Sequence, residues 1–137
     1  MVALRAWYDP DNDHEPIAVT TTADADAFLD RLAHDRAAMQ VPPLMQLSRR
    51  DPDGWAVLHV GINTDRGILT YTDATGSYVT TNNTTATNEP LTYDYMGHVR
   101  QVPGNAELPL ADVCKAVHEF VTTGGARPTC VQWQPDQ

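Results

Sequence analysis

The chain has few of the residues that most often supply reactive side chains or positive charge. Its 137 residues include one lysine, two serines and two cysteines. Two cysteines are too few for a disulfide framework, and neither serine lies in the glycine-flanked turn of a serine nucleophile. The longest apolar run covers residues 55–62, whereas a membrane helix needs roughly 18 such residues. Disulfide-rich domains, serine hydrolases and membrane spans are therefore not expected.

The start of the chain also lacks a basic region followed by a long apolar stretch, which is the pattern of a secretory signal. We therefore expect a cytoplasmic protein. A length of 137 residues suits one domain over residues 1–137, and an apolar content of 42% argues against disorder. In a reducing compartment, Cys114 and Cys130 are expected to be buried free thiols. A redox pair between them is the minor alternative, because a helix and the following strand can bring them close.

Negative charge is in clear excess. The 18 acidic residues outnumber the 9 basic ones, so the formal net charge is −9. Nucleic acids and anionic membranes are bound through neutralisation of their phosphates by Lys and Arg, so a chain this acidic suits neither. The charge favours a basic partner. An acidic surface that only keeps the protein soluble is the simpler explanation, and charge alone does not separate the two.

Short strand-like segments separated by turn residues make up most of the chain. The turns at residues 51–54, 63–67 and 73–76 are short enough to join antiparallel neighbours. We therefore predict an α+β fold, with an antiparallel sheet of about five to seven strands and two helices packed on one face. The strand-like segments are residues 2–8, 17–21, 44–48, 55–62, 68–71, 77–80, 91–95, 97–102 and 128–133.

Two helices are predicted from their ends and from the spacing of their apolar residues. The first begins after a Thr21 or Thr22 cap, with aspartates in its first turn that suit the helix dipole. It should end near residue 37. The second begins at Pro109, since proline suits the first helical position. It should end at the glycine pair 124–125, because glycine adopts the left-handed cap conformation easily.

Three stretches carry a resemblance to a known family. One is the run at residues 60–71, another leads from Pro103 to Pro109, and the third covers residues 125–133. Together they resemble the Imm1 family of immunity proteins over roughly residues 44–134. The matching hairpin residues are Asp65, Gly67, Leu69 and Tyr71.

The resemblance implies a function that composition and periodicity do not show. Members of this family are α+β proteins encoded beside polymorphic bacterial toxins, and they neutralise the toxin in the producing cell. Nucleic-acid deaminases are frequent among these toxins. We therefore expect a non-enzymatic inhibitor that covers the active site or substrate groove of a basic toxin. We expect it to bind neither nucleic acid nor membrane itself.

Residues that could hold a metal or catalyse a reaction lack the required spacing. Asp9, Asp11 and Asp13 begin like a calcium loop, but His14 and Thr20 stand where glycine and glutamate are needed. The histidines show no zinc spacing. A zinc deaminase would need a His-x-Glu and a later Cys-x-x-Cys, so the chain is not the deaminase itself. We predict no catalytic residue, no metal site and no cofactor.

Tyrosines beside acidic residues are the predicted partner-binding feature. Tyrosine is a favoured interface anchor, and acidic neighbours suit a basic groove. The alternative is that two or more of these rings pack in the core or on the solvated face of the sheet. The predicted residues are Asp65, Tyr71, Asp73, Tyr78, Glu89, Tyr93, Asp94 and Tyr95.

Two other functions remain open from the sequence. A small enzyme or small-molecule-binding module would use a cleft beside Tyr71, Tyr93 and His98. Buried, convergent polar groups with perturbed pKa values would favour that function. A structural or chaperone-like partner without a toxin is the third alternative.

Overall fold

The computed structural model describes residues 4–7, 17–37, 39–51, 54–84, 89–95 and 98–136. The acidic loop weighed above as a calcium site lies outside these residues. No helix within them is long and apolar enough to cross a membrane. The helices are α1 (Thr22–Arg36) and α2 (Leu110–Thr122). The strands are β1 (Leu4–Trp7), β2 (Ile17–Val19), β3 (Leu44–Asp51), β4 (Gly54–Asn63), β5 (Arg66–Asp73), β6 (Gly76–Thr80), β7 (Leu91–Tyr95), β8 (His98–Val102), β9 (Leu108–Pro109) and β10 (Trp133–Pro135).

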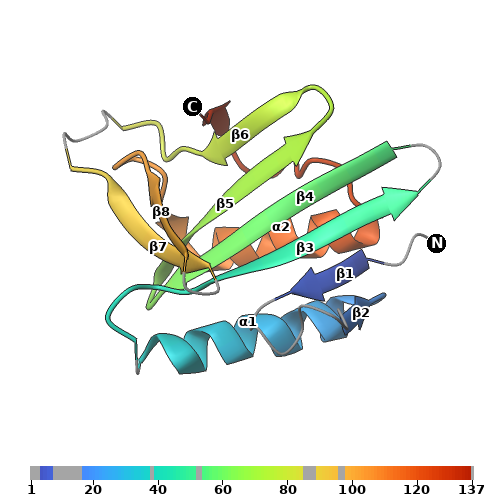
Figure 1. Cartoon of the computed structure of the whole chain (residues 1–137), viewed down its shortest axis with the longest axis horizontal. Coiled ribbons are helices and arrows are strands. Elements are labelled where there is room, and N and C mark those ends of the chain that lie inside the picture. The colour runs from blue at the N-terminus through green and yellow to red at the C-terminus, as the bar shows by residue number, and fades with distance from the viewer. Residues whose placement is uncertain are drawn as a thin grey trace.

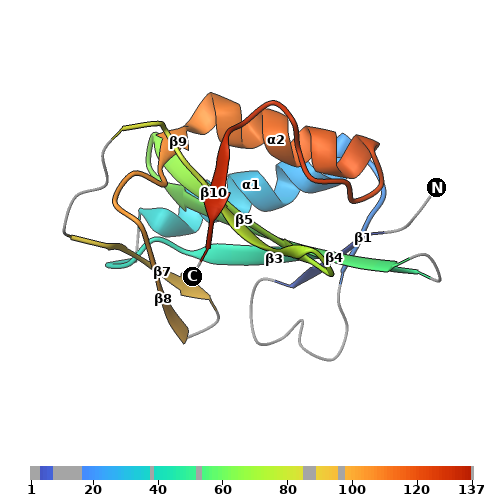
Figure 2. The ribbon, with the colours of Figure 1, turned by 90° about the horizontal axis from the view of Figure 1, so that it is seen from above.

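The described strands form a main sheet of eight and a separate pair. The main sheet has the order β10-β6-β5-β4-β3-β1-β2, with β9 paired to β5, and β7 pairs with β8. Both helices lie over one face of the main sheet (Figure 1, Figure 2). The predicted α+β fold is confirmed. The sheet exceeds the expected strand number because β9 has only two residues, too few to show a period-2 pattern.

The centre of the sheet is the predicted antiparallel meander, β3 to β6. Asn63 pairs with Arg66 and Asp73 pairs with Gly76, so two residues form each of these turns. Thr64 has a φ of 61°, the left-handed conformation that tight hairpin turns favour. These short connections hold the four strands in sequence order.

Helix α1 begins with a capping box. The Thr21 hydroxyl accepts the Asp24 backbone N–H at 3.2 Å, and Asp24 Oδ2 accepts the Thr21 N–H at 3.2 Å. These bonds satisfy backbone N–H groups that have no intrahelical partner at the start of a helix. Hydrogen bonds from the Thr20 and Thr21 backbone keep the pKa of Asp24 below its usual value. The predicted threonine cap is therefore Thr21, and the predicted end near residue 37 is confirmed.

Helix α2 ends in a Schellman motif. The Gly124 N–H donates to the Val121 carbonyl at 3.2 Å, and the Gly125 N–H donates to the Phe120 carbonyl at 2.8 Å. Both glycines have positive φ, 73° and 107°, which other residues adopt only with strain. The predicted stop at this pair is confirmed. The helix starts one residue later than predicted, because Pro109 is its N-cap.

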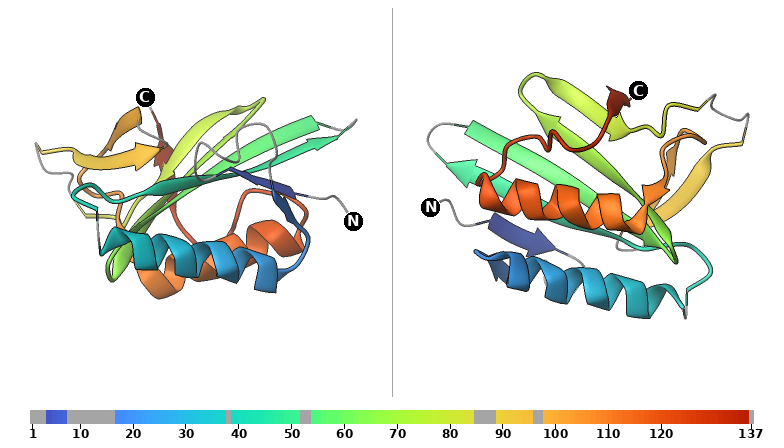
Figure 3. Two further views of the ribbon diagram at one scale, coloured as in Figure 1. Left: turned by 60° about the horizontal axis from the view of Figure 1, so that its bottom comes forward. Right: turned by 180° about the vertical axis from the view of Figure 1, so that it is seen from behind.

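Each face of the main sheet has its own core. Alternate strand residues point toward the helices and form the larger core. On the other face, the β7–β8 hairpin covers one end of the sheet and encloses a smaller core around Tyr93 (Figure 2, Figure 3). No described helix or strand covers the rest of that second face. The helix-side core includes Leu4, Met45, Leu47, Leu58, Val60, Leu69, Val113, Val117 and Phe120.

The last predicted strand is wrong in position. Residues 128–132 form no strand, and β10 begins only at Trp133. The Glu119 carboxylate accepts the backbone N–H groups of Thr129 at 2.6 Å and Cys130 at 3.2 Å. The Trp133 indole N–H donates to the Pro128 carbonyl at 2.8 Å. Backbone groups bound by side chains cannot join a ladder, so the alternation of residue types at 129–133 was misleading.

Only part of the expectation for the cysteines holds. Both are free thiols, but Cys114 is half-buried and Cys130 is exposed. Burial, with the nearby charges of Asp26 and Asp30, raises the pKa of the Cys114 thiol. Cys130 lies at the surface because its backbone is bound to Glu119 outside the sheet.

Candidate functional site

The predicted partner-binding residues lie in separate places. Asp65 is in the β4–β5 turn, whereas Asp73 is at the far end of β5. The other seven residues of β5 lie between them, so they are roughly 26 Å apart along the chain. Tyr78 lies beside Asp73 on the β5–β6 hairpin, and the remaining surface residues belong to the β7–β8 region. The structure therefore does not bring the eight residues into one patch.

Tyr71 faces the helices and is only 5% exposed. Its ring packs edge to face on Phe120, with the ring centroids 6.3 Å apart. Its hydroxyl donates to Asp73 Oδ2 at 3.1 Å. Burial and then the Asp73 charge raise the pKa of Tyr71 to about 12. Tyr71 is thus a core residue with a bound polar tip, and its ring does not reach the surface.

Tyr93 lies on the opposite face of the main sheet and is completely buried. Its hydroxyl donates to Glu107 Oε2 at 2.8 Å, and the same oxygen accepts the Asn63 side-chain N–H at 3.0 Å. Because the sheet separates Tyr71 from Tyr93, the described residues form no shared cleft between them. Both tyrosines therefore pack in a core, which is the alternative given for the predicted binding residues.

The β5–β6 hairpin keeps acidic and aromatic residues together near the surface. Asp73 Oδ1 accepts the Thr75 backbone N–H at 2.8 Å. Burial acts to raise the pKa of Asp73, but its bonds from Thr75 and Tyr71 outweigh this and lower the pKa. The Arg127 guanidinium lies 4.5 Å from the Tyr78 ring centroid, a cation–π contact. This hairpin is therefore a half-buried patch with both charge signs side by side.

A polar cluster around His59 joins the β7–β8 hairpin to the end of the chain. Arg100 Nη2 donates to Asp136 Oδ2 at 2.7 Å. The Tyr95 ring meets the His59 ring at a steep angle, with centroids 5.2 Å apart. His59 Nδ1 lies 3.3 Å from Thr70 Oγ1. Burial and then the Arg100 charge lower the pKa of His59 to about 4, so the imidazole is neutral at neutral pH and acts as a structural group.

The feature that the sequence interpretation missed is the open face, meaning the side of the main sheet turned away from the helices. Ala56 and Leu58 belong to the helix-side core, so Trp55 and Val57 point to the open face. Trp55 is 43% exposed. The sequence identifies residues 55–62 as the longest apolar run and as a strand, without assigning its residues to two faces. The sequence does carry a signal for two unlike faces, which is the alternation of residue polarity along this run. Trp55 shares a face with positions 59 and 61, which are less apolar than their neighbours.

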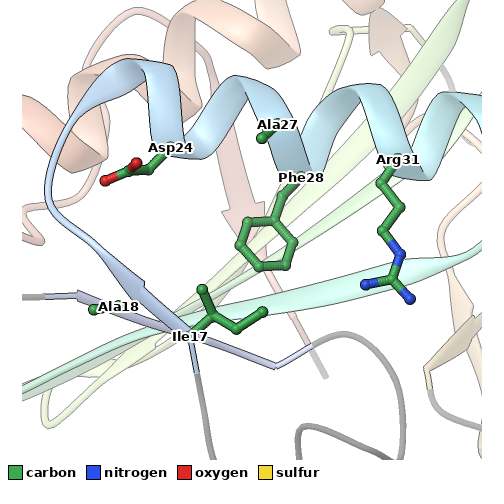
Figure 4. Close-up of a pocket in the computed structure, with 6 residues that line it drawn as sticks. All are labelled: Ile17, Ala18, Asp24, Ala27, Phe28 and Arg31. Atoms are coloured by element: carbon green, nitrogen blue, oxygen red, sulfur yellow. The ribbon is translucent and has the colours of Figure 1, made fainter.

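A shallow hollow of about 300 Å³ lies between β2 and α1 (Figure 4). Its apolar wall is formed mainly by Ile17 and Phe28, and Asp24 and Arg31 lie at its ends. The Asp24 carboxylate is already bound to the backbone of the capping box. Within the described ranges, no three His, Cys, Asp or Glu side chains are grouped to hold a metal ion. The hollow therefore offers apolar contact and little specific chemistry.

The family model for the immunity protein Imm1 matches residues 13–135. The chain belongs to the Imm1 family. It is therefore a non-enzymatic immunity protein that neutralises a cognate toxin. The match confirms the resemblance in residues 44–134 and extends it over α1. A search of curated proteins found no match. For an Imm1 protein, the functional site is a surface that binds the toxin.

Proposed function

We propose that this Imm1 protein neutralises a toxin that acts on nucleic acid, of the deaminase type, by binding over its active site or substrate groove. A groove that accommodates a polyanion is basic. The net charge of −9 suits such a partner and is the observation that carries the proposal. Family membership supports toxin binding in general, and the charge supports this particular kind of toxin.

The acidic surface acts mainly on the rate of encounter. Attraction between opposite net charges speeds association over a long range, and salt screens it. Asp65 suits this role because its side chain is 84% exposed. Tyr71 and Tyr93 support the fold and are not part of the proposed surface. The predicted residues that remain candidates for toxin contact, at separate places on the acidic surface, are Asp65, Asp73, Tyr78, Glu89, Asp94 and Tyr95.

The direct test uses the purified toxin domain encoded by the adjacent gene, with DNA and RNA oligonucleotides as substrates. We expect a stoichiometric amount of this protein to abolish deamination, and we expect a sub-nanomolar dissociation constant, which corresponds to at least about 12 kcal/mol of binding free energy. A toxin that binds but does not modify nucleic acid would contradict the proposed toxin type. A complex that stays fully active would contradict occlusion of the active site.

Asp65→Lys should slow association with a basic toxin about three-fold at low ionic strength, with little change in dissociation. The side chain is exposed, so the fold should not change. Association rates measured at low and high salt check this, and the difference should vanish at high salt. Charge reversal at Asp73 is less informative, because its carboxylate holds the β5–β6 turn.

Arg66→Gln is the matched control for this prediction. Arg66 occupies the same turn, and its side chain is 65% exposed. Removing its positive charge makes the protein more acidic, so association with a basic toxin should become faster. Equal association rates for the wild type and both variants would show that this end of the sheet does not steer the toxin.

A further inference from the structure

The open face carries an exposed aromatic residue within a basic surrounding. Arg50 pairs with Trp55 across β3 and β4. Ser48 pairs with Arg5 on one side and with Val57 on the other. Residues paired across strands lie roughly 5 Å apart, and residues two apart on one face lie roughly 7 Å apart. These five residues, Arg5, Ser48, Arg50, Trp55 and Val57, therefore form one contiguous surface, here called the Trp55 patch.

The sign of the charge on this patch is opposite to that of the whole protein. Arg5 and Arg50 are both exposed. Among the described side chains that β1, β3, β4, β5 and β6 direct to the open face, none is acidic. In a chain with a net charge of −9, this local excess of arginine is an exception to the general pattern, and it surrounds the most exposed described tryptophan.

Packing among the described residues does not account for the position of the Trp55 side chain. The helices cover the other face, and the β7–β8 hairpin lies over the end of the sheet near Leu44, Gly61 and Ile68 (Figure 3). Trp55 lies toward the opposite end, beside the β3–β4 turn. Tryptophan and arginine are both enriched among the hot spots of protein interfaces, so these residue types suit a partner-binding surface.

We propose that the Trp55 patch docks an apolar segment of the cognate toxin that is flanked by carboxylates. Trp55 and Val57 contact the apolar side chains, and Arg50 and Arg5 pair with the carboxylates through their planar guanidinium groups. The proposal rests on the proposed direct binding of the toxin. It adds that a basic toxin presents a locally acidic segment to this patch, which orients the toxin after the long-range encounter.

A second copy of this chain is a poorer occupant. Two Trp55 patches facing each other would bring arginines against arginines, and like charges placed opposite each other disfavour association. Nucleic acid is also disfavoured, because the rest of the chain repels phosphate. An acid-flanked segment of a partner is the occupant that satisfies both the tryptophan and its arginines.

The test measures binding of the purified toxin domain from the adjacent gene to variants of this protein by interferometry. Trp55→Ala should weaken binding about 30-fold or more, mainly through faster dissociation. Arg50→Glu should weaken it about 10-fold, because a toxin carboxylate would then face a like charge. Thermal unfolding should show that both variants remain folded, since both positions are exposed.

Two variants serve as matched controls. Val99→Ala removes an apolar side chain that is 69% exposed on β8, and it should leave affinity within about two-fold. Arg66→Glu makes the same change in net charge as Arg50→Glu, but at the opposite end of the sheet. It should not weaken binding of a basic toxin.

The outcomes separate this proposal from the proposed function. Failure of the wild type to bind or inhibit the toxin would overturn the proposed function itself. Tight wild-type binding that Trp55→Ala and Arg50→Glu leave unchanged would overturn the docking role of the Trp55 patch alone. Sedimentation of the protein without toxin provides a further check. A dimer that Trp55→Ala dissociates, with toxin affinity unchanged, would assign the patch to a second copy and also overturn the proposal.

Discussion

Gly67→Ala should destabilise the domain by about 3 kcal/mol or more, at the upper end of overpacking effects. A Cβ atom at Gly67 would overlap the backbone carbonyl oxygen of Gly61 on the neighbouring strand, and it would lie 3.3 Å from Val113 Cγ2 on α2. A side chain in contact with the new Cβ atom could change its rotamer to avoid the overlap. The Gly61 carbonyl cannot, because β4 is held on both sides by β3 and β5.

Urea unfolding followed by circular dichroism checks this prediction, and Gly104→Ala is its control. Gly104 is a turn glycine without a positive φ, so alanine there should change the unfolding free energy by less than about 1 kcal/mol. The double variant Gly67→Ala/Val113→Ala separates the two contacts. If it is as stable as Val113→Ala alone, the overlap is with Val113 and the backbone explanation is wrong.

Gly67 also shows where sequence interpretation reaches its limit. It was visible as part of the turn at 63–67 and as one of the residues that carry the family resemblance. From the sequence it could equally have been a turn glycine or a functional one. The structure shows that it is buried and lies against the Gly61 backbone. That reason depends on strand register and on α2, neither of which local pattern specifies.

The elements and their order were largely predictable because each has a local physical cause. The Thr21 capping box, the 124–125 glycine pair and the two-residue turns of the meander are all encoded by neighbouring residues. The last strand was misplaced because its backbone is held by Glu119, a residue on α2. A contact between distant parts of the chain overrode the local alternation there.

The candidate site was less predictable than the fold, because exposure depends on which elements cover which face. Tyr71 and Tyr93 are similar in sequence context, yet they lie in cores on opposite faces of the main sheet. Trp55 begins an apolar run, yet it is exposed because the β7–β8 hairpin reaches only the other end of the open face. Alternation along β4 separates its two faces. It does not tell which face a distant hairpin will cover.

Lowering the pH should reduce the unfolding free energy, because His59 is buried as the neutral imidazole. The pKa of His59 is about 4 in the folded protein, below the ordinary value near 6.5 that holds in the unfolded chain. The unfolded chain therefore binds the additional proton between these two values, so stability is full above about pH 6.5 and falls as the pH decreases toward 4. The imidazole resists protonation because it is largely desolvated, and because Arg100, which is paired to Asp136, adds positive charge nearby.

We expect the wild type to lose about 2 kcal/mol more unfolding free energy than His59→Gln between neutral pH and about pH 4.5. Urea unfolding at a series of pH values gives the unfolding free energy of both proteins. Subtracting one from the other removes the contribution of the carboxyl groups, because these titrate in both proteins. His34→Gln, at an exposed helix position, is the matched control and should follow the wild-type curve. Parallel curves for wild type and His59→Gln would mean that the ring takes up a proton at little cost when folded. The polar cluster would then not exclude charge from the junction between the β7–β8 hairpin and the main sheet.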